Sequence, residues 1–125
     1  MTSWRVVVNR RTGVRLAARA RWCASFGCRL RGLMFQRALP PGEALLLVES
    51  RESRAGASIH MFFVPFSIGV VWINTAGRVV DTVLAEAGRP YYAPRAPARY
   101  TLEAAPAILD SVAIGDDVDF EILAA

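Results

Sequence analysis

Apolar and polar residues alternate at the start of the chain and predict a β-hairpin. Trp4, Val6 and Val8 share one side of the first segment, with the period of two that is typical of a half-buried strand. Gly13 can take the positive φ that closes the turn at residues 11–13. Residues 14–22 then return as an amphipathic strand. Its predicted faces are Val14, Leu16, Ala18, Ala20 and Trp22 inward, and Arg15, Ala17, Arg19 and Arg21 outward.

The spacing of apolar residues becomes helical after Ser25. The Ser25 hydroxyl can cap a first turn, and the spacing predicts a short helix from about Ser25 to Gln36. The apolar residues at this spacing are Phe26, Leu30, Leu33 and Met34. Prolines and a glycine at 40–42 then break the chain, and the apolar run at 44–48 predicts a strand covered on both faces. We expect residues 51–57 to form an exposed polar loop.

The second half continues as a series of short strands. Segments 58–64 and 67–74 are rich in β-branched and aromatic residues, with a bend at Pro65 between them because proline lacks an amide donor. The remaining predicted elements are a hairpin turn at 74–77, a strand at 78–84, an irregular connection at 88–99, a strand at 99–104, a short helix from Pro106 to about Ser111, and a last strand with Val118, Phe120 and Ile122 inward.

Together these elements predict a mainly β fold. We expect a β-sandwich or closed barrel of about seven to nine strands with one or two short helices. The 125 residues have the length of one domain, spanning 1–125. The side chains predicted to form the core include Trp4, Leu16, Trp22, Phe63, Trp72 and Phe120.

Charge is distributed unevenly around a net value of +4. Residues 1–37 hold nine arginines and no acid, whereas the rest of the chain holds six arginines and eleven carboxylates. Opposite charges attract across paired strands, so we expect the last strand to pair beside strand 14–22. The charged side chains concerned are Arg15, Arg19 and Arg21 against Asp117, Asp119 and Glu121. Nucleic-acid binding through these arginines is not favoured, because no aromatic platform is interleaved with them.

Hydropathy and cysteine content predict a cytoplasmic protein without a membrane span. The longest apolar stretch, 61–73, is shorter than the roughly 20 residues that a spanning helix needs, and it contains Pro65 and Gly69. The apolar start ends at residues 9–11 before it reaches the length of a secretory signal. Two cysteines, Cys23 and Cys28, are too few for a disulfide framework and predict buried thiols in a reducing compartment.

Several segments resemble a prokaryotic family, the domain of unknown function 192. Residues 29–35, Arg-Leu-Arg-Gly-Leu-Met-Phe, are similar to its arginine-rich Gly-Leu-Met signature, and residues 59–70 are similar to its second block. Leu102-Glu103 and Ile114-Gly115-Asp116 resemble the third and last blocks, so that the resemblance covers about residues 14–122. The departures from the family pattern are Cys28, Gln36, Val64 and Gly69. The resemblance implies a closed or nearly closed β-sandwich or barrel whose short helix carries the signature, and it implies no activity.

His60 and Glu103 form the first candidate site. His60 is the only histidine, and it needs either a structural partner for its ring or a second titrating group with which to act. Arg29 and Arg31 lie at alternate helix positions and cannot point the same way. One of them is expected to pair with a carboxylate such as Glu103 or Asp116, either to fix the helix on the sheet or to help bind an anion.

The irregular connection at 88–99 supplies the second candidate site. Tyr91 and Tyr92 offer flat faces for stacking and Arg95 offers a guanidinium clamp, although the same residues could instead cap one end of the fold. Cys23, Cys28 and His60 do not have the spacing of a zinc site. Neither a glycine-rich phosphate loop nor a nucleophile elbow is present, and we assign no metal, cofactor or catalytic residue.

Three functions follow from these candidates. The first is a non-enzymatic binding or accessory module for a small polar ligand or a protein partner. The second is an enzyme that uses His60 and Glu103 as acid and base, and the third is a weak nucleic-acid or anion binder that uses the N-terminal arginines. An enzyme should present a concave pocket containing both His60 and Glu103, whereas an accessory module should bury them or expose an apolar patch.

Overall fold

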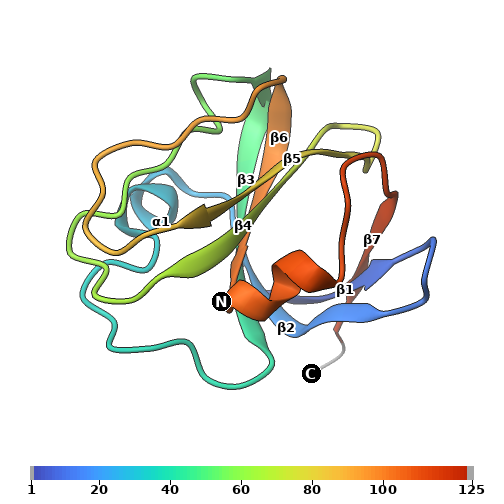
Figure 1. The fold of residues 1–125 in the computed structure, drawn as a ribbon, viewed down its shortest axis with the longest axis horizontal. Helices are drawn as coiled ribbons and strands as arrows, with labels where there is room; N and C mark the ends of the chain where they lie inside the picture. The colour runs from blue at the N-terminus through green and yellow to red at the C-terminus, as the bar shows by residue number, and fades with distance from the viewer. Residues whose placement is uncertain (1, 124–125) are drawn as a thin grey trace.

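The fold is one curled sheet with two short helices, seen in a computed structural model that describes residues 2–123 (Figure 1). Its seven strands are β1 (Trp4–Asn9), β2 (Arg15–Cys23), β3 (Glu43–Ser53), β4 (Ile68–Ile73), β5 (Val79–Ala85), β6 (Ala98–Ala104) and β7 (Val118–Ile122). The helices are α1 (Phe26–Arg31) and the 3-10 helix η1 (Pro106–Asp110). The structure confirms the mainly β prediction and the short helices.

The strands follow the order β5-β4-β6-β3-β2-β1-β7 and curl into a half-barrel. Neighbours are antiparallel except β2 and β3, which are parallel because α1 and the chain after it connect them. The outer strands approach each other at one end, where Arg78 and Asp117 form a single bridge and Val118 N–H donates to the Gly77 carbonyl at 2.8 Å. Since β5 and β7 share no continuous ladder in residues 2–123, closure into a full barrel stays a prediction.

Strands β3, β4 and β6 are covered on both faces, as the continuous apolar run at 44–48 predicted for β3. Alternate residues of β3, β4 and β6 enter two hydrophobic clusters on opposite sides of the sheet. Leu46 and Leu102 belong to the cluster under η1, whereas Leu45, Leu47 and Trp72 belong to the cluster under residues 54–67. Glu103 follows Leu102 on β6 and therefore faces this second cluster.

Residues 54–67 form a covering loop rather than the predicted strand at 58–64. Their only bridge within the described chain joins Ile59 to Tyr92, and the loop is anchored where the Trp72 indole donates to the Ala57 carbonyl at 2.8 Å. Phe63 takes a positive φ of 60°, which no regular strand residue adopts. As a result Phe63 is 65% exposed, and its predicted place in the core is wrong.

The last strand does not pair with β2, contrary to the charge argument. β1 lies between them and pairs antiparallel with both. The tight hairpin occupies one edge of β1 and leaves its other edge for β7, so backbone pairing outweighs the weak attraction of exposed charges. Asp119 instead meets Arg10 at 3.5 Å, and Asp117 meets Arg78 at 3.2 Å.

Register shifts between β1 and β2 alter which side chains face inward. Ala17 and Ala20 are buried while Ala18 is exposed, so the strict alternation predicted for 14–22 is broken. On β7, the edge strand that pairs with β1, Ile122 is exposed, contrary to its predicted inward position. Among the predicted core residues, Trp72 is fully buried, Leu16, Trp22 and Phe120 pack on the core, and Trp4 is half-buried.

Candidate functional site

A cavity of about 290 Å³ lies between α1, the covering loop and the sheet. Four of the predicted site residues line it together, namely Arg29, Arg31, His60 and Glu103. Its wall is mostly aliphatic and includes Leu33, Leu47, Met61, Val64 and Ile68. We call this cavity the α1 pocket. It is the concave pocket that was expected to distinguish an enzyme from an accessory module.

Local interactions hold α1 over the pocket. The Ser25 hydroxyl accepts from the Cys28 N–H at 3.2 Å, which confirms the predicted N-cap. The helix ends at Arg31, five residues before the predicted end, because Gly32 takes a φ of 50° and donates its N–H to the Cys28 carbonyl. A helix of this length is marginal by itself, so its position depends on what ties it to the sheet.

A disulfide between Cys23 and Cys28 is one of these ties, with their Cα atoms 5.6 Å apart. The prediction of two free thiols is therefore wrong: the reversal of chain direction between the end of β2 and α1 brings the two sulfurs together. Disulfides persist in oxidising environments. The expectation of a cytoplasmic location depended partly on free thiols and loses that support.

Glu103 is the most unusual group in the pocket. Its side chain is only 5% exposed, and among residues 2–123 no hydrogen bond or ion pair reaches its carboxyl group. No fully enclosed side-chain oxygen in the described chain lacks a partner, so the Glu103 oxygens must reach the pocket. Burial raises the pKa of Glu103 to about 8. At neutral pH this side chain is therefore mainly a neutral acid that can donate a hydrogen bond.

His60 is half-buried on the covering loop and accepts from the Phe62 N–H at its Nδ1, at 3.2 Å. In the neutral ring this bond places the proton on Nε2. Within the described chain Nε2 has no protein partner, so it is free to donate to a ligand. His60 thus has a hydrogen-bond partner within its own loop, and it also lines the α1 pocket together with Glu103, the predicted second titrating group.

The two signature arginines differ sharply in their bonding. Arg29 donates to the Ala24 carbonyl at 2.8 Å and to the Val48 carbonyl at 3.2 Å, and its Nε lies 3.5 Å from Glu49. Arg31 is exposed and makes no ion pair with any residue of the 2–123 range. The carboxylate that pairs with a signature arginine is therefore Glu49, and neither Glu103 nor Asp116 has this role.

Glu49 is a pocket residue that the sequence analysis missed. The predicted strand stopped at 48, whereas β3 continues to Ser53. Extending the alternation of Leu45 and Leu47 by one step would have placed Glu49 on the same face.

The second candidate site does not come together at the pocket. Arg95 is bound by Asp81, whose carboxylate accepts from the Arg95 backbone and guanidinium at 3.0 Å. The Tyr92 hydroxyl accepts from the Glu86 N–H at 2.9 Å, and its ring packs on the core. Tyr91 is largely exposed, and so is the side chain of Arg95 despite its pairing with Asp81. The connection at 88–99 therefore resembles the structural cap that was the alternative interpretation.

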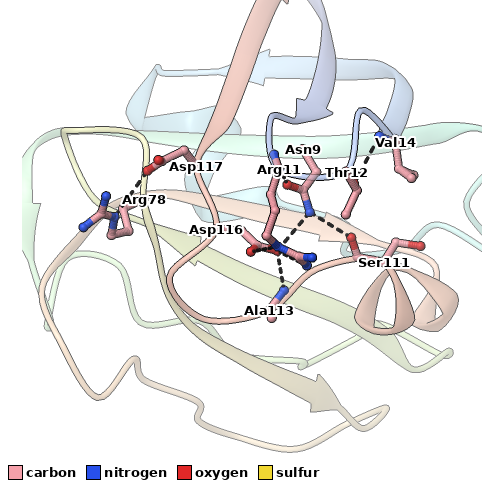
Figure 2. A network of polar contacts seen from close by, with 9 residues as sticks. All are labelled: Asn9, Arg11, Thr12, Val14, Arg78, Ser111, Ala113, Asp116 and Asp117. Atoms are coloured by element: carbon pink, nitrogen blue, oxygen red, sulfur yellow. Dashed lines mark hydrogen bonds and ion pairs between the residues drawn. The ribbon is translucent and has the colours of Figure 1, made fainter.

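A separate polar network surrounds Asp116 at the end of the sheet (Figure 2). The Asp116 carboxylate accepts from Asn9 Nδ2 at 2.9 Å, from the Ala113 N–H at 2.8 Å and from both Nε and a terminal nitrogen of Arg11. The Arg11 bond and the backbone bond hold the pKa of Asp116 well below its usual range. Every donor here comes from the protein, so this network joins the first hairpin to the turn before β7.

Apolar residues are exposed next to the α1 pocket. Phe26 and Leu30 lie at its rim. Phe35 and Phe63 stack with ring centroids 5.1 Å apart, although both are about two-thirds exposed. Both have positive φ values and they share a backbone hydrogen bond. Strained, exposed aromatic residues of this kind are typical of recognition surfaces.

Residues 2–123 contain no cluster of three or more acidic, histidine or cysteine side chains placed to hold a metal ion. They also contain no helix with the length and hydropathy to cross a bilayer.

Comparisons with known proteins place these features in a family. The sequence profile of the domain of unknown function 192, described as "Uncharacterized ACR", matches residues 7–120. A UPF0127 protein of Thermococcus sibiricus is 34% identical over 94% of this chain and 75% of its own length. A UPF0127 protein of Pyrococcus furiosus is 31% identical over 91% of this chain and 97% of its own.

Solved structures share the fold. A crystal structure of a provisionally described transcription regulator from Sinorhizobium meliloti matches with a TM-score of 0.81 at 15% identity, covering 96% of this chain and 94% of that one. A protein of unknown function from Novosphingobium aromaticivorans matches with a TM-score of 0.78 at 20% identity, covering 92% and 83%. At these identities the likeness establishes the architecture only.

Proposed function

Because the chain belongs to the domain of unknown function 192 family, in which no activity is established, we propose a function from the α1 pocket itself: the protein binds a small molecule there, with Glu103 as its polar anchor. The single observation that carries this proposal is a buried carboxyl group without a protein partner. Leaving such a group unpaired costs free energy. A ligand that bonds to it recovers that cost.

The surroundings of Glu103 fit a binding site better than an ordinary core. Its oxygens open into a cavity whose size, about 290 Å³, is at the lower end of small-molecule sites. An aliphatic wall with a few polar groups is the usual composition of such sites. Pocket residues come from α1, from the covering loop and from three strands, so a rigid sheet positions one side and short segments position the other.

A screen of small fragments by two-dimensional NMR tests this function. We expect the amide signals of Gly32, His60 and Glu103 to shift on binding. Met34→Trp should fill the pocket and abolish the shifts, whereas Ile114→Trp, at an exposed site outside the pocket, should retain them. Near-native spectra for both variants establish that they fold. Fragment shifts confined to other surfaces would show that the α1 pocket is not the binding site.

Acid–base catalysis is the second candidate function, favoured by the presence of His60 and Glu103 in the same pocket. A neutral acid with a pKa near 8 and an imidazole can exchange protons with a substrate at neutral pH. Prolonged incubation of each bound fragment with the protein separates this function from simple binding. An enzyme converts the fragment and loses conversion in Glu103→Gln, whereas a binding module returns it unchanged.

A further inference from the structure

We propose that the ligand of the α1 pocket is an organic anion, such as a carboxylate, on a short hydrocarbon body. Its charged end would be held by Arg31 and His60, with its hydrocarbon on the aliphatic wall and Glu103 donating to one of its oxygens. This inference rests on the proposed binding function and names the chemical class that the site selects.

Arg31 gives the pocket a free hydrogen-bond donor. The Arg31 guanidinium is unpaired within residues 2–123, whereas Arg29 is occupied by two carbonyls and by Glu49. An arginine fork bonds carboxylate or phosphate oxygens in pairs. The division of roles between the two arginines leaves one of them available to an anion.

His60 adds a second donor. Its Nδ1 already accepts from Phe62 N–H, which places the remaining ring proton of the neutral imidazole on Nε2. A ligand that accepts hydrogen bonds would satisfy this nitrogen, whereas a ligand amine would place donor against donor.

Glu103 does not oppose an anion as an ionised carboxylate would. The helix ends beside it, with Gly32 so close that a Cβ there would lie 4.0 Å from Glu103 Oε1. The pKa of about 8 leaves the group mainly neutral at pH 7, so it donates to an oxygen instead of repelling it. Of the other charges facing the pocket, Glu49 is offset by Arg29, which leaves Arg31 in excess.

The pocket wall fixes the rest of the ligand. Leu47, Met61, Val64 and Ile68 give an aliphatic surface, and the exposed Phe26 and Leu30 extend it at the rim. Each methylene group buried there strengthens binding by roughly fourfold. The limited volume favours a chain of only a few carbons, with its head toward the arginine side.

Three probes of equal length test the ligand class: hexanoate, hexylamine and hexanol, titrated by NMR at about pH 6.5, well below the pKa of Glu103. We expect hexanoate to bind at least tenfold more tightly than hexylamine and more tightly than hexanol. Arg31→Gln should weaken the binding of hexanoate by roughly tenfold without affecting the binding of hexanol. Arg37→Gln, which removes an exposed arginine outside the pocket, is the matched control.

A second titration with hexanoate at about pH 9, above the pKa of Glu103, tests the role of this side chain as a neutral donor. At this pH Glu103 is ionised and repels the hexanoate carboxylate, so hexanoate affinity should fall by roughly tenfold. The other charged or titratable groups that face Glu103 are Glu49, Arg29, Arg31 and His60. The fall should be absent in Glu103→Gln. Tighter binding of hexylamine or hexanol than of hexanoate, or no binding of any probe, overturns the proposal that the ligand is an organic anion. Neither outcome affects the binding function, which the fragment screen decides separately.

Discussion

Two carboxyl groups in this protein are equally buried but have opposite surroundings. Asp116 and Glu103 are each 5% exposed. Asp116 accepts hydrogen bonds from Asn9, Arg11 and Ala113, whereas Glu103 has no partner in residues 2–123. Their pKa values move in opposite directions, because donors stabilise the charge of Asp116 while burial penalises that of Glu103.

The difference distinguishes a structural group from a group that is available for function. A buried acid surrounded by protein donors contributes to folding and has nothing left to offer a ligand. A buried acid without donors lowers stability and persists only where something else favours it. Because Glu103 lines a cavity, a ligand is the simplest such cause.

The largest expected effect is on the pH dependence of stability, through Glu103→Gln. The raised pKa means that the folded state keeps a proton that the unfolded chain releases. The free energy of unfolding therefore falls between about pH 4.5 and pH 8 and then levels off. The native protein should lose roughly 4 kcal/mol over this window, and the variant should lose far less. Urea denaturation at a series of pH values measures both profiles.

The groups facing Glu103 across the pocket, Arg29, Arg31, Glu49 and His60, are unchanged in this variant. Any contribution they make appears in both profiles. Glu121→Gln removes an exposed carboxylate of β7 and serves as the control. Parallel profiles for the native protein and Glu103→Gln would mean that Glu103 titrates normally. This result would contradict the claim that the pKa values of Glu103 and Asp116 are shifted in opposite directions.

Asp116→Ala should have the next largest effect, and here the carboxyl group stabilises the fold instead of destabilising it. It removes the acceptor shared by Asn9, Arg11 and the Ala113 amide, and we expect a fall in Tm of roughly 8 °C. Because the pKa of Asp116 is depressed, its contribution is present above about pH 4 and is lost as the pH falls through acid values. Thermal unfolding at pH 7 and at acid pH checks both parts.

The control for this variant is Asp119→Ala, which removes an exposed carboxylate paired with Arg10. Exposed ion pairs contribute little, so its Tm should stay close to the native value. Equal losses in the two variants would assign the effect to net charge instead of the network in Figure 2.

The sequence predicted the strands better than it predicted these two environments. Alternation or continuous burial located most strands, because side-chain burial repeats along a strand. The predictions from alternation and composition were wrong where contacts between distant segments determine the structure. These places are the covering loop at 58–64, the position of β1 between β2 and β7, and the disulfide. Each depends on contacts between segments that no local pattern encodes.

The same limit applies to the site. The family resemblance singled out Glu103, His60 and the signature arginines together, and all of them line the pocket. Composition could not show that Arg29 is occupied while Arg31 is free, since both have the same side chain. Asp116 and Glu103 were equally plausible partners for an arginine in sequence, and only the fold gives one of them Arg11.

The smallest of these effects concerns the disulfide that ties α1 over Glu103. Replacing Cys23 and Cys28 by alanine should lower the free energy of unfolding by about 2 kcal/mol, as expected for a short closed loop. If loosening α1 admits water, the pKa of Glu103 should also move toward its ordinary value, and the stability lost between pH 4.5 and 8 should shrink. Urea denaturation with and without a thiol reductant measures both, with the double variant as the reductant-insensitive control. A native pH profile in the reduced protein would show that the fold around Glu103, rather than the covalent tie, keeps its pKa raised.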